Sequence, residues 1–128
     1  MSVHNVTIFG LGEAGALIAQ GLVAAKAQVT AFDPADVVTP AGVVRVSSPL
    51  EAVIDSDIVI AITAGDDAIV AMNQALEGIP AGALYADFST NSVAIKKQLA
   101  ACAASQQLHF ADVALMSIVP GKGIHTPV

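Results

Sequence analysis

The stretch Gly10-Leu11-Gly12-Glu13-Ala14-Gly15 decides the fold class of this chain. A short β-rich apolar run, Val3 to Phe9, precedes it, and apolar residues at helical spacing follow over residues 13–26. We expect a second strand over Val29 to Phe32, which ends at Asp33. A strand, a G-x-G-x-x-G turn, a helix and a second strand ending in an acidic residue together form the context of a dinucleotide-binding fingerprint.

The three glycines of this turn have separate expected roles. Gly10 permits the tight turn from strand to helix, Gly12 leaves the room that a pyrophosphate needs, and Gly15 lets the helix pack closely on the strand. The amides of the first helical turn and the helix dipole then face the phosphates. The alternative is a tight turn that holds no ligand, and the full strand–turn–helix–strand context favours the dinucleotide site.

Asp33 is the candidate for binding the adenosine ribose, because it lies 18 residues after Gly15 at the end of the second strand. Its carboxylate can accept hydrogen bonds from the two ribose hydroxyls, and it would repel a 2′-phosphate. No Arg or Lys lies between Lys26 and Arg45, and Asp36 adds negative charge. This pattern favours NAD over NADP. A side-chain turn at the Asp-Pro step explains the same aspartate without a ligand.

Strand and helix patterns alternate along the rest of the chain. Further strands are expected over residues 43–46, 58–62, 84–88 and 108–110, and helices over residues 50–54, around Ile69, Met72 and Leu76, and around Ile95, Leu99 and Cys102. Lys96 and Lys97 are expected on the outer side of the last helix. The order predicts an α/β, doubly wound parallel sheet of the Rossmann type. Residues 1–128 suit a single domain, and we expect it to belong to a longer, two-domain protein.

Composition narrows the function classes. The chain is 55% hydrophobic and only 12% charged, which excludes a disordered segment. Its net charge of −6 and scattered cations argue against a nucleic-acid or membrane partner. A single cysteine excludes an intrachain disulfide, and the three histidines lack metal-ligand spacing, so no metal is expected. So few charges also predict that another domain or chain covers part of the surface. A reducing, cytoplasmic setting fits these features.

Three further loops are expected at the carboxyl ends of strands, where ligands bind in such sheets. They are residues 63–66, residues 87–91 and a loop that begins near Asp112. Within the second loop, a Ser, Thr or Asn side chain also suits an ordinary helix N-cap. Asp55 and Asp57 precede a strand, away from this edge, and are expected to be solvated.

These motifs together resemble the β-hydroxyacid dehydrogenases, a family that includes 3-hydroxyisobutyrate, tartronate semialdehyde and 6-phosphogluconate dehydrogenases. Residues 10–22 resemble the family's G-L-G-x-M-G-x-x-x-A-x-x-L opening. Asp87-Phe88-Ser89-Thr90 is similar to its D-x-S-T, and residues 110–115 are similar to its F-x-D-A-P-V. Order and spacing agree over nearly the whole chain.

The resemblance implies contacts for a cofactor and a substrate. Along the pyrophosphate it places Leu11, Gly12, Glu13 and Ala14, and at the two ends of the cofactor it places Asp33 on the adenosine ribose, Thr63 and Ala64 near the nicotinamide-side ribose, and Thr90 at the nicotinamide. Toward the substrate it places Met116, Ser117 and Ile118, where the family usually has Ser-Gly-Gly. That departure resembles a branch of the 6-phosphogluconate dehydrogenase-like proteins and points away from the usual short hydroxyacids.

The resemblance also implies that no catalytic residue lies within this chain. The family's catalytic lysine lies on a helical second domain, beyond Val128, and Lys122 in its glycine loop is not a candidate. The expected protein is therefore a dehydrogenase that acts on a small molecule with NAD, and that forms a homo-oligomer through the second domain. The chain alone is expected to be inactive. Two alternatives remain: an imine reductase, which shares this domain, and a regulatory dinucleotide sensor without catalysis. A methyltransferase is less favoured, because its glycine turn has a different spacing.

Overall fold

The structure is a computed structural model that describes residues 4–63, 66–88 and 92–113. Its strands are β1 (Asn5–Phe9), β2 (Gln28–Phe32), β3 (Val43–Arg45), β4 (Ile58–Ala61), β5 (Leu84–Asp87) and β6 (His109–Asp112). Its helices are α1 (Glu13–Ala24), α2 (Pro49–Val53), α3 (Asp66–Ala75) and α4 (Val93–Ser105), with a short 3₁₀ turn, η1 (Leu76–Gly78), after α3. Each strand and helix expected from the sequence is present, with ends that differ by a few residues.

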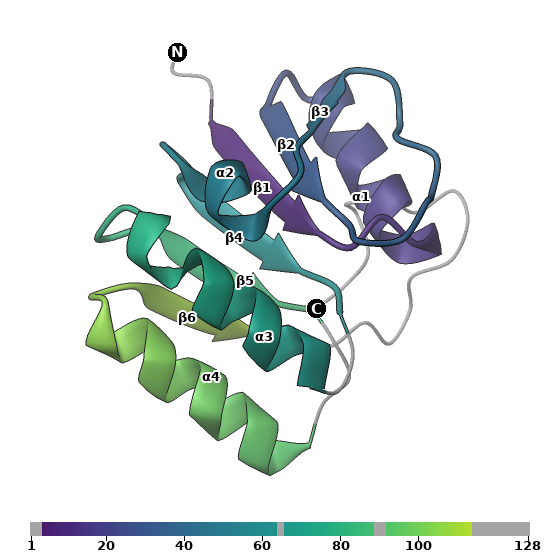
Figure 1. Ribbon diagram of the computed structural model, residues 1–128. Coiled ribbons are helices and arrows are strands. Elements are labelled where there is room, and N and C mark those ends of the chain that lie inside the picture. Colours follow the sequence, from purple (N-terminus) through teal and green to yellow (C-terminus); the bar gives the residue numbers. More distant parts are fainter. Residues whose placement is uncertain (1–3, 64–65, 89–91, 114–128) are drawn as a thin grey trace.

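The six described strands form one parallel sheet in the order β3-β2-β1-β4-β5-β6 (Figure 1). The chain enters at the centre with β1, moves outward through β2 and β3, and returns to β4 on the other side of β1. The strand order therefore reverses between β1 and β4, and the crevice at the carboxyl ends of these strands is where such sheets bind ligands. The expected doubly wound fold is confirmed.

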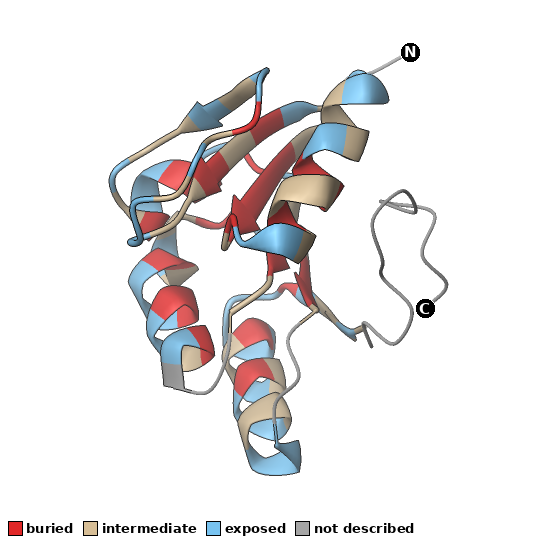
Figure 2. Ribbon diagram, turned by 90° about the vertical axis from the view of Figure 1, so that its right-hand side faces the viewer, coloured by how far each residue is buried: buried red, intermediate tan, exposed pale blue. Residues whose placement is uncertain are grey.

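Two apolar layers hold the helices against the sheet. On one face, Ile18 and Ala19 of α1 are buried against Val6 and Ile8 of β1. On the opposite face, α2, α3 and α4 lie side by side and bury their apolar side chains against Phe9 and the later strands (Figure 1). Figure 2 shows the buried residues concentrated in the strands and on the helix sides that face them. A sheet buried on both faces explains why its strands read as apolar runs.

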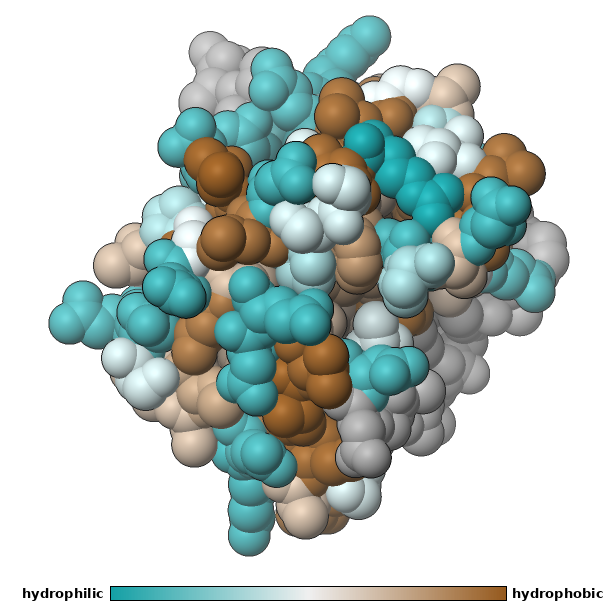
Figure 3. All heavy atoms as spheres, viewed as in Figure 1, coloured by the Kyte–Doolittle hydropathy of each residue, from teal (hydrophilic) through white to brown (hydrophobic). Residues whose placement is uncertain are grey.

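The described surface carries apolar side chains scattered among polar ones. Val44, Leu50, Ile54 and Val70 are each more than 40% exposed, and Figure 3 shows apolar groups interspersed with hydrophilic ones on the face of α2, α3 and α4. The expected cover by another domain or chain stays a prediction. In the described part of the chain, no helix is long and apolar enough to span a bilayer.

Candidate dinucleotide-binding site

The turn between β1 and α1 requires glycine at two positions. Gly10 has a φ of +103°, and a Cβ there would lie 2.4 Å from the carbonyl oxygen of Ile62. A Cβ on Gly15 would lie 1.9 Å from the carbonyl oxygen of Gly10. Both distances are far below van der Waals contact, so these glycines allow the chain to turn and α1 to approach β1 and β4. The structural roles expected for Gly10 and Gly15 are those that the structure shows.

Gly12 differs from Gly10 and Gly15, because the fold does not require a glycine at this position. Its backbone has φ −66° and ψ −167°, which any residue adopts, and a Cβ there would meet no atom of the described residues within 4 Å. The side of the turn at Gly12 is therefore open to solvent. The glycine thus leaves open a space that a side chain would fill.

The N-terminus of α1 has no side-chain cap, because its N-cap residue is a glycine. Gly12 occupies its N-cap position without a side-chain hydrogen bond. In α2 and α4, by contrast, the N-caps Ser48 and Ser92 each accept a hydrogen bond from a backbone N–H of the first turn. The first amides of an uncapped helix, together with its dipole, form an anion site. The structure thus leaves α1 with the donors that a phosphate would take.

Asp33 lies beside this turn and is already oriented by two backbone amides. Its Oδ2 accepts a hydrogen bond of 2.7 Å from the N–H of Leu11, and its Oδ1 accepts one of 2.8 Å from the N–H of Ala35. The second bond is the side-chain turn that the Asp-Pro step allows, so that alternative is present. A carboxylate has about four acceptor positions, and two therefore remain, enough for the two hydroxyls of a ribose.

Arg45 contacts the backbone at Asp33, and the sequence pattern does not indicate this contact. Its Nη2 donates a hydrogen bond of 2.7 Å to the carbonyl oxygen of Asp33, 12 residues earlier. Pairing of β2 with β3 brings it there, because Arg45 lies opposite Ala31 in the register. A cation therefore does lie near Asp33 in the structure, although no Arg or Lys lies between Lys26 and Arg45 in the sequence. No motif marks Arg45, and only the strand pairing could have found it.

A second charged cluster lies at the carboxyl ends of β5 and β6. Asp87 and Asp112 are paired in the sheet register, and Lys96 from the first turn of α4 contacts both carboxylates, at 2.8 Å and 2.5 Å. Burial alone would lower the pKa of Lys96, but its bonds to Asp112 and Asp87 outweigh burial and raise that pKa. The expectation that Lys96 lies on the outer side of its helix is wrong, because two carboxylates at the strand ends attract it. Lys97 is exposed, as expected.

This cluster joins two of the motifs that carry the family resemblance. Asp87 begins the D-x-S-T segment and Asp112 belongs to the F-x-D segment. The Asp87 side chain is fully buried and the Asp112 side chain is 57% exposed. Lys96 therefore neutralises a buried carboxylate and fixes the ends of two neighbouring strands. A lysine in the first helical turn opposes the helix dipole, and that conflict is the sequence signal for a carboxylate partner.

Tyr85 brings a buried hydroxyl next to the cluster. The side chain is fully buried between the rings of Phe9 and Phe110, and its hydroxyl has no hydrogen-bond partner among the described residues. Burial, and then the nearby carboxylate of Asp87, raise the pKa of Tyr85 far above its ordinary value. The hydroxyl therefore stays protonated, and the ring of Tyr85 packs in the apolar layer with Phe9 and Phe110.

Several expected contacts lie outside the described residues. Thr63 is described and lies just beyond β4, at the same edge of the sheet as the glycine turn. The residues that the structure describes do not include Ala64, Thr90, Met116, Ser117 and Ile118. The part of the site that the structure brings together is therefore the glycine turn, Asp33 and the end of β4. Within the described residues, no group of three or more His, Cys, Asp or Glu could hold a metal ion.

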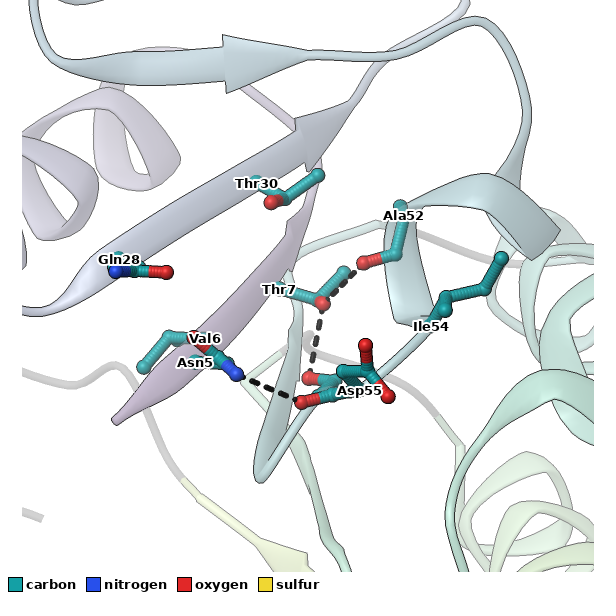
Figure 4. A pocket seen from close by; sticks show the side chains of 9 residues that line it. Asn5, Val6, Thr7, Gln28, Thr30, Ala52, Ile54 and Asp55 are labelled. Atoms are coloured by element: carbon teal, nitrogen blue, oxygen red, sulfur yellow. Dashed lines mark hydrogen bonds between the residues drawn. The ribbon is translucent and has the colours of Figure 1, made fainter. Parts of the chain in front are cut away.

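A cavity of about 200 Å³ lies at the opposite, amino-terminal edge of the strands (Figure 4). Asn5 and Gln28, the first residues of β1 and β2, line it, and the Asn5 amide donates to the carbonyl oxygen of Asp55. The N–H of Asn5 also donates to the carboxylate of Asp57, at 2.9 Å. Asp57 is thus a partner of β1 as well as a solvated group. The cavity lies away from the glycine turn, because all the strands run parallel.

The strand order and the glycine turn define a Rossmann-type dinucleotide-binding domain. Residues 5–116 match the family described as the NAD binding domain of 6-phosphogluconate dehydrogenase, and the chain belongs to this family. The fold and the family expected from the three motifs are confirmed. No curated protein sequence is significantly similar to the chain.

Solved structures agree with this assignment. The chain is similar to 3-hydroxyisobutyrate dehydrogenase from Mycobacterium tuberculosis, solved with L-serine, at 28% identity and a TM-score of 0.78, over 87% of this chain and 40% of that one. It also has the fold of an imine reductase from Myxococcus stipitatus in complex with NADP⁺, at 17% identity and a TM-score of 0.77, over 88% and 41%. The V8 variant of that reductase, in complex with NAD⁺, matches at 17% identity and 0.74, over 91% and 42%. The chain therefore spans less than half the length of each.

Proposed function

We propose that this chain is the cofactor-binding half of a nicotinamide-dependent oxidoreductase and that its cofactor is NAD. The observation that carries the proposal is the N-terminus of α1. Its N-cap residue is Gly12, an exposed glycine at a position where the fold does not require one. The residues fit the cofactor. The backbone of Leu11, Gly12, Glu13 and Ala14 would hold the pyrophosphate, Asp33 the adenosine ribose, Thr63 and Ala64 the second ribose, and Thr90 the nicotinamide.

The preference for NAD rests on the charge around Asp33. A 2′-phosphate would meet the carboxylate of Asp33, and the exposed Asp36 is three residues further on. The nearby guanidinium of Arg45 is directed at backbone carbonyls. An uncharged ribose, by contrast, can donate both hydroxyls to the remaining acceptor positions of Asp33.

The reaction proposed for the whole protein is the transfer of a hydride between the nicotinamide and a hydroxyl-bearing carbon of a hydroxyacid-type substrate, in either direction. Bound NAD supplies a nicotinamide that accepts or gives a hydride. This chain would bind and orient that cofactor, and residues 116–118 would face the substrate. A lysine on a helical domain outside residues 1–128 would act as acid and base, and the same domain would form a homo-oligomer. We place the protein in the cytoplasm.

A second enzymatic function is favoured by the likeness to the imine reductases. Such an enzyme would use the same domain to reduce a C=N bond and would lack the lysine. The two readings differ in substrate and share the cofactor site. A regulatory sensor would bind the dinucleotide and turn over neither substrate.

The test combines binding with turnover. NADH and NADPH are titrated into the 128-residue chain by calorimetry, and a panel of hydroxyacids and cyclic imines is assayed with this chain and with the full-length protein. We expect the chain to bind NADH without turnover, since general acid–base catalysis contributes roughly 10²–10⁴-fold. Turnover by the chain at the full-length rate would refute the placement of the acid–base group elsewhere. Failure to bind either nucleotide would refute the proposed function itself.

A further inference from the structure

The loop that follows β2 is organised around one guanidinium. Arg45, the last residue of β3, donates through Nη2 to the carbonyl oxygens of Asp33 and Ala35. Through Nη1 it donates to the carbonyl oxygen of Val37 and, at 3.4 Å, to the hydroxyl of Thr39. Four acceptors spread over seven residues of chain therefore converge on two nitrogens.

This loop has no regular secondary structure to define its shape. Residues 33–39 contain neither helix nor strand, and three of their carbonyl groups point at the same place. Carbonyl dipoles that converge repel one another unless a cation lies between them. The Arg45 fork satisfies them as a planar set of donors, which the point charge of a lysine cannot do.

The same loop carries the carboxylate that would bind the ribose. Arg45 holds the main-chain oxygen of Asp33, while the side-chain oxygens of Asp33 accept from Leu11 in the glycine turn and from Ala35 in the loop. Asp33 is thus fixed from both ends, by amides at its carboxylate and by a guanidinium at its carbonyl. Removing the guanidinium would release the main chain and, with it, the orientation of the carboxylate.

We propose that Arg45 is a positioning residue for the adenosine-ribose site and that it sets both the affinity for NAD and the preference over NADP. It acts through Asp33 and does not itself contact a 2′-phosphate, because both of its terminal nitrogens are already directed at two acceptors each. This inference rests on the proposed function, since it presupposes that a dinucleotide binds beside Asp33.

The experiment measures NADH and NADPH affinities of the protein with Arg45→Met, Arg45→Lys and Lys97→Met. Methionine keeps most of the side-chain length without the charge, and Lys97→Met removes one exposed cation from α4 as a matched control. We expect Arg45→Met to weaken NADH binding by about tenfold, the equivalent of one charge-assisted hydrogen bond, and NADPH binding by less. The NADH affinity of Arg45→Lys should lie between those of the native protein and of Arg45→Met. Lys97→Met should bind both nucleotides with the native affinities.

A double-mutant cycle with Asp33→Ala separates positioning from simple stability. If Arg45 acts through Asp33, the combined variant loses less NADH affinity than the product of the two single effects. Multiplicative effects, or equal losses for both nucleotides in step with a lowered Tm, would show a purely structural role and overturn the inference. A selective loss of NADPH binding in Arg45→Met would make the guanidinium a phosphate ligand and would also overturn it. A native protein that binds neither nucleotide would remove the proposed function, and this inference with it.

Discussion

Substituting Gly12 by valine tests the cofactor site with little effect on the fold. The backbone of Gly12 is extended at ψ −167°, and a Cβ there meets no atom of the described residues within 4 Å, so a branched side chain has room to start from this exposed position. Valine is a poorer N-cap than glycine by about 0.5–1 kcal/mol. The unfolded chain loses conformational freedom on the same substitution, which offsets about 0.4–1 kcal/mol. The free energy of unfolding should therefore hardly change.

Binding should respond very differently, because the valine would occupy the place of the pyrophosphate. Each charge-assisted hydrogen bond to a helix-terminal amide contributes about 1.5–3 kcal/mol. Losing two such bonds amounts to at least about 3 kcal/mol, which is on the order of a hundredfold in affinity. We expect no measurable NADH binding by Gly12→Val at concentrations that saturate the native chain.

The assay is NADH titration by fluorescence or calorimetry, with circular dichroism and a thermal melt on each variant. Gln20→Val is the matched control, because it places the same branched side chain at an exposed position of α1, about two turns further along. It should bind NADH like the native chain. An affinity of Gly12→Val close to native, with a retained circular dichroism spectrum, would show that the pyrophosphate does not lie on this turn.

Three further substitutions test neighbouring parts of the structure. Asp33→Ala should weaken NADH binding by about 1.5–3 kcal/mol for each lost hydrogen bond. In the same titrations, the difference between the affinities for NADH and NADPH should become smaller. Lys96→Met should lower the free energy of unfolding by about 1.5–3 kcal/mol in urea titrations at pH 7, because the buried carboxylate of Asp87 loses a charge-assisted hydrogen bond. The raised pKa of Lys96 means that its contribution is complete below its ordinary pKa of 10.5 and is lost as pH rises through the folded value, so the native and Lys96→Met curves should converge in alkali. Tyr85→Phe should leave the free energy of unfolding unchanged or raise it by about 1 kcal/mol in thermal melts, because it removes a buried hydroxyl that has no hydrogen-bond partner among the described residues; a large loss would mean that the hydroxyl is bonded.

The fold could be predicted almost completely, because its signals are local and repeat along the chain. Buried parallel strands give short apolar runs, and each was found within a few residues of its observed position. Helix ends were less well placed. The helix expected over residues 13–26 ends at Ala24, and Lys26 follows with a φ of +72°. The end of this helix depends on a left-handed lysine, which the sequence pattern does not mark.

In the site, too, local motifs could be predicted from the sequence, and contacts that depend on the folded chain could not. The glycine turn and Asp33 are local motifs whose spacing carries the geometry, so their place in the fold follows from the sequence, and their contacts with a cofactor stay a prediction. Arg45 and Lys96 are brought to their partners by strand pairing and by a helix turn; the sequence pattern gives no position for Arg45 and places Lys96 on the wrong side of its helix. A long cationic side chain can reach several acceptors, and its distance along the chain says little about which one it finds.

The acidic character of the chain and its proposed ligand fit together once the source of positive charge is considered. The chain carries a net charge of −6, yet the proposed ligand is a dinucleotide with two phosphates. At the described part of the site, the attraction would come from the backbone amides of α1, which act over the first turn only. The nearby cation, Arg45, is directed at carbonyl groups of its own loop. Positive potential would therefore be concentrated at the pyrophosphate, while the ribose position would face the carboxylate of Asp33. A third phosphate at that position would add a charge without adding a donor. By this reasoning, the same loop that gives NAD its hydrogen bonds would exclude NADP.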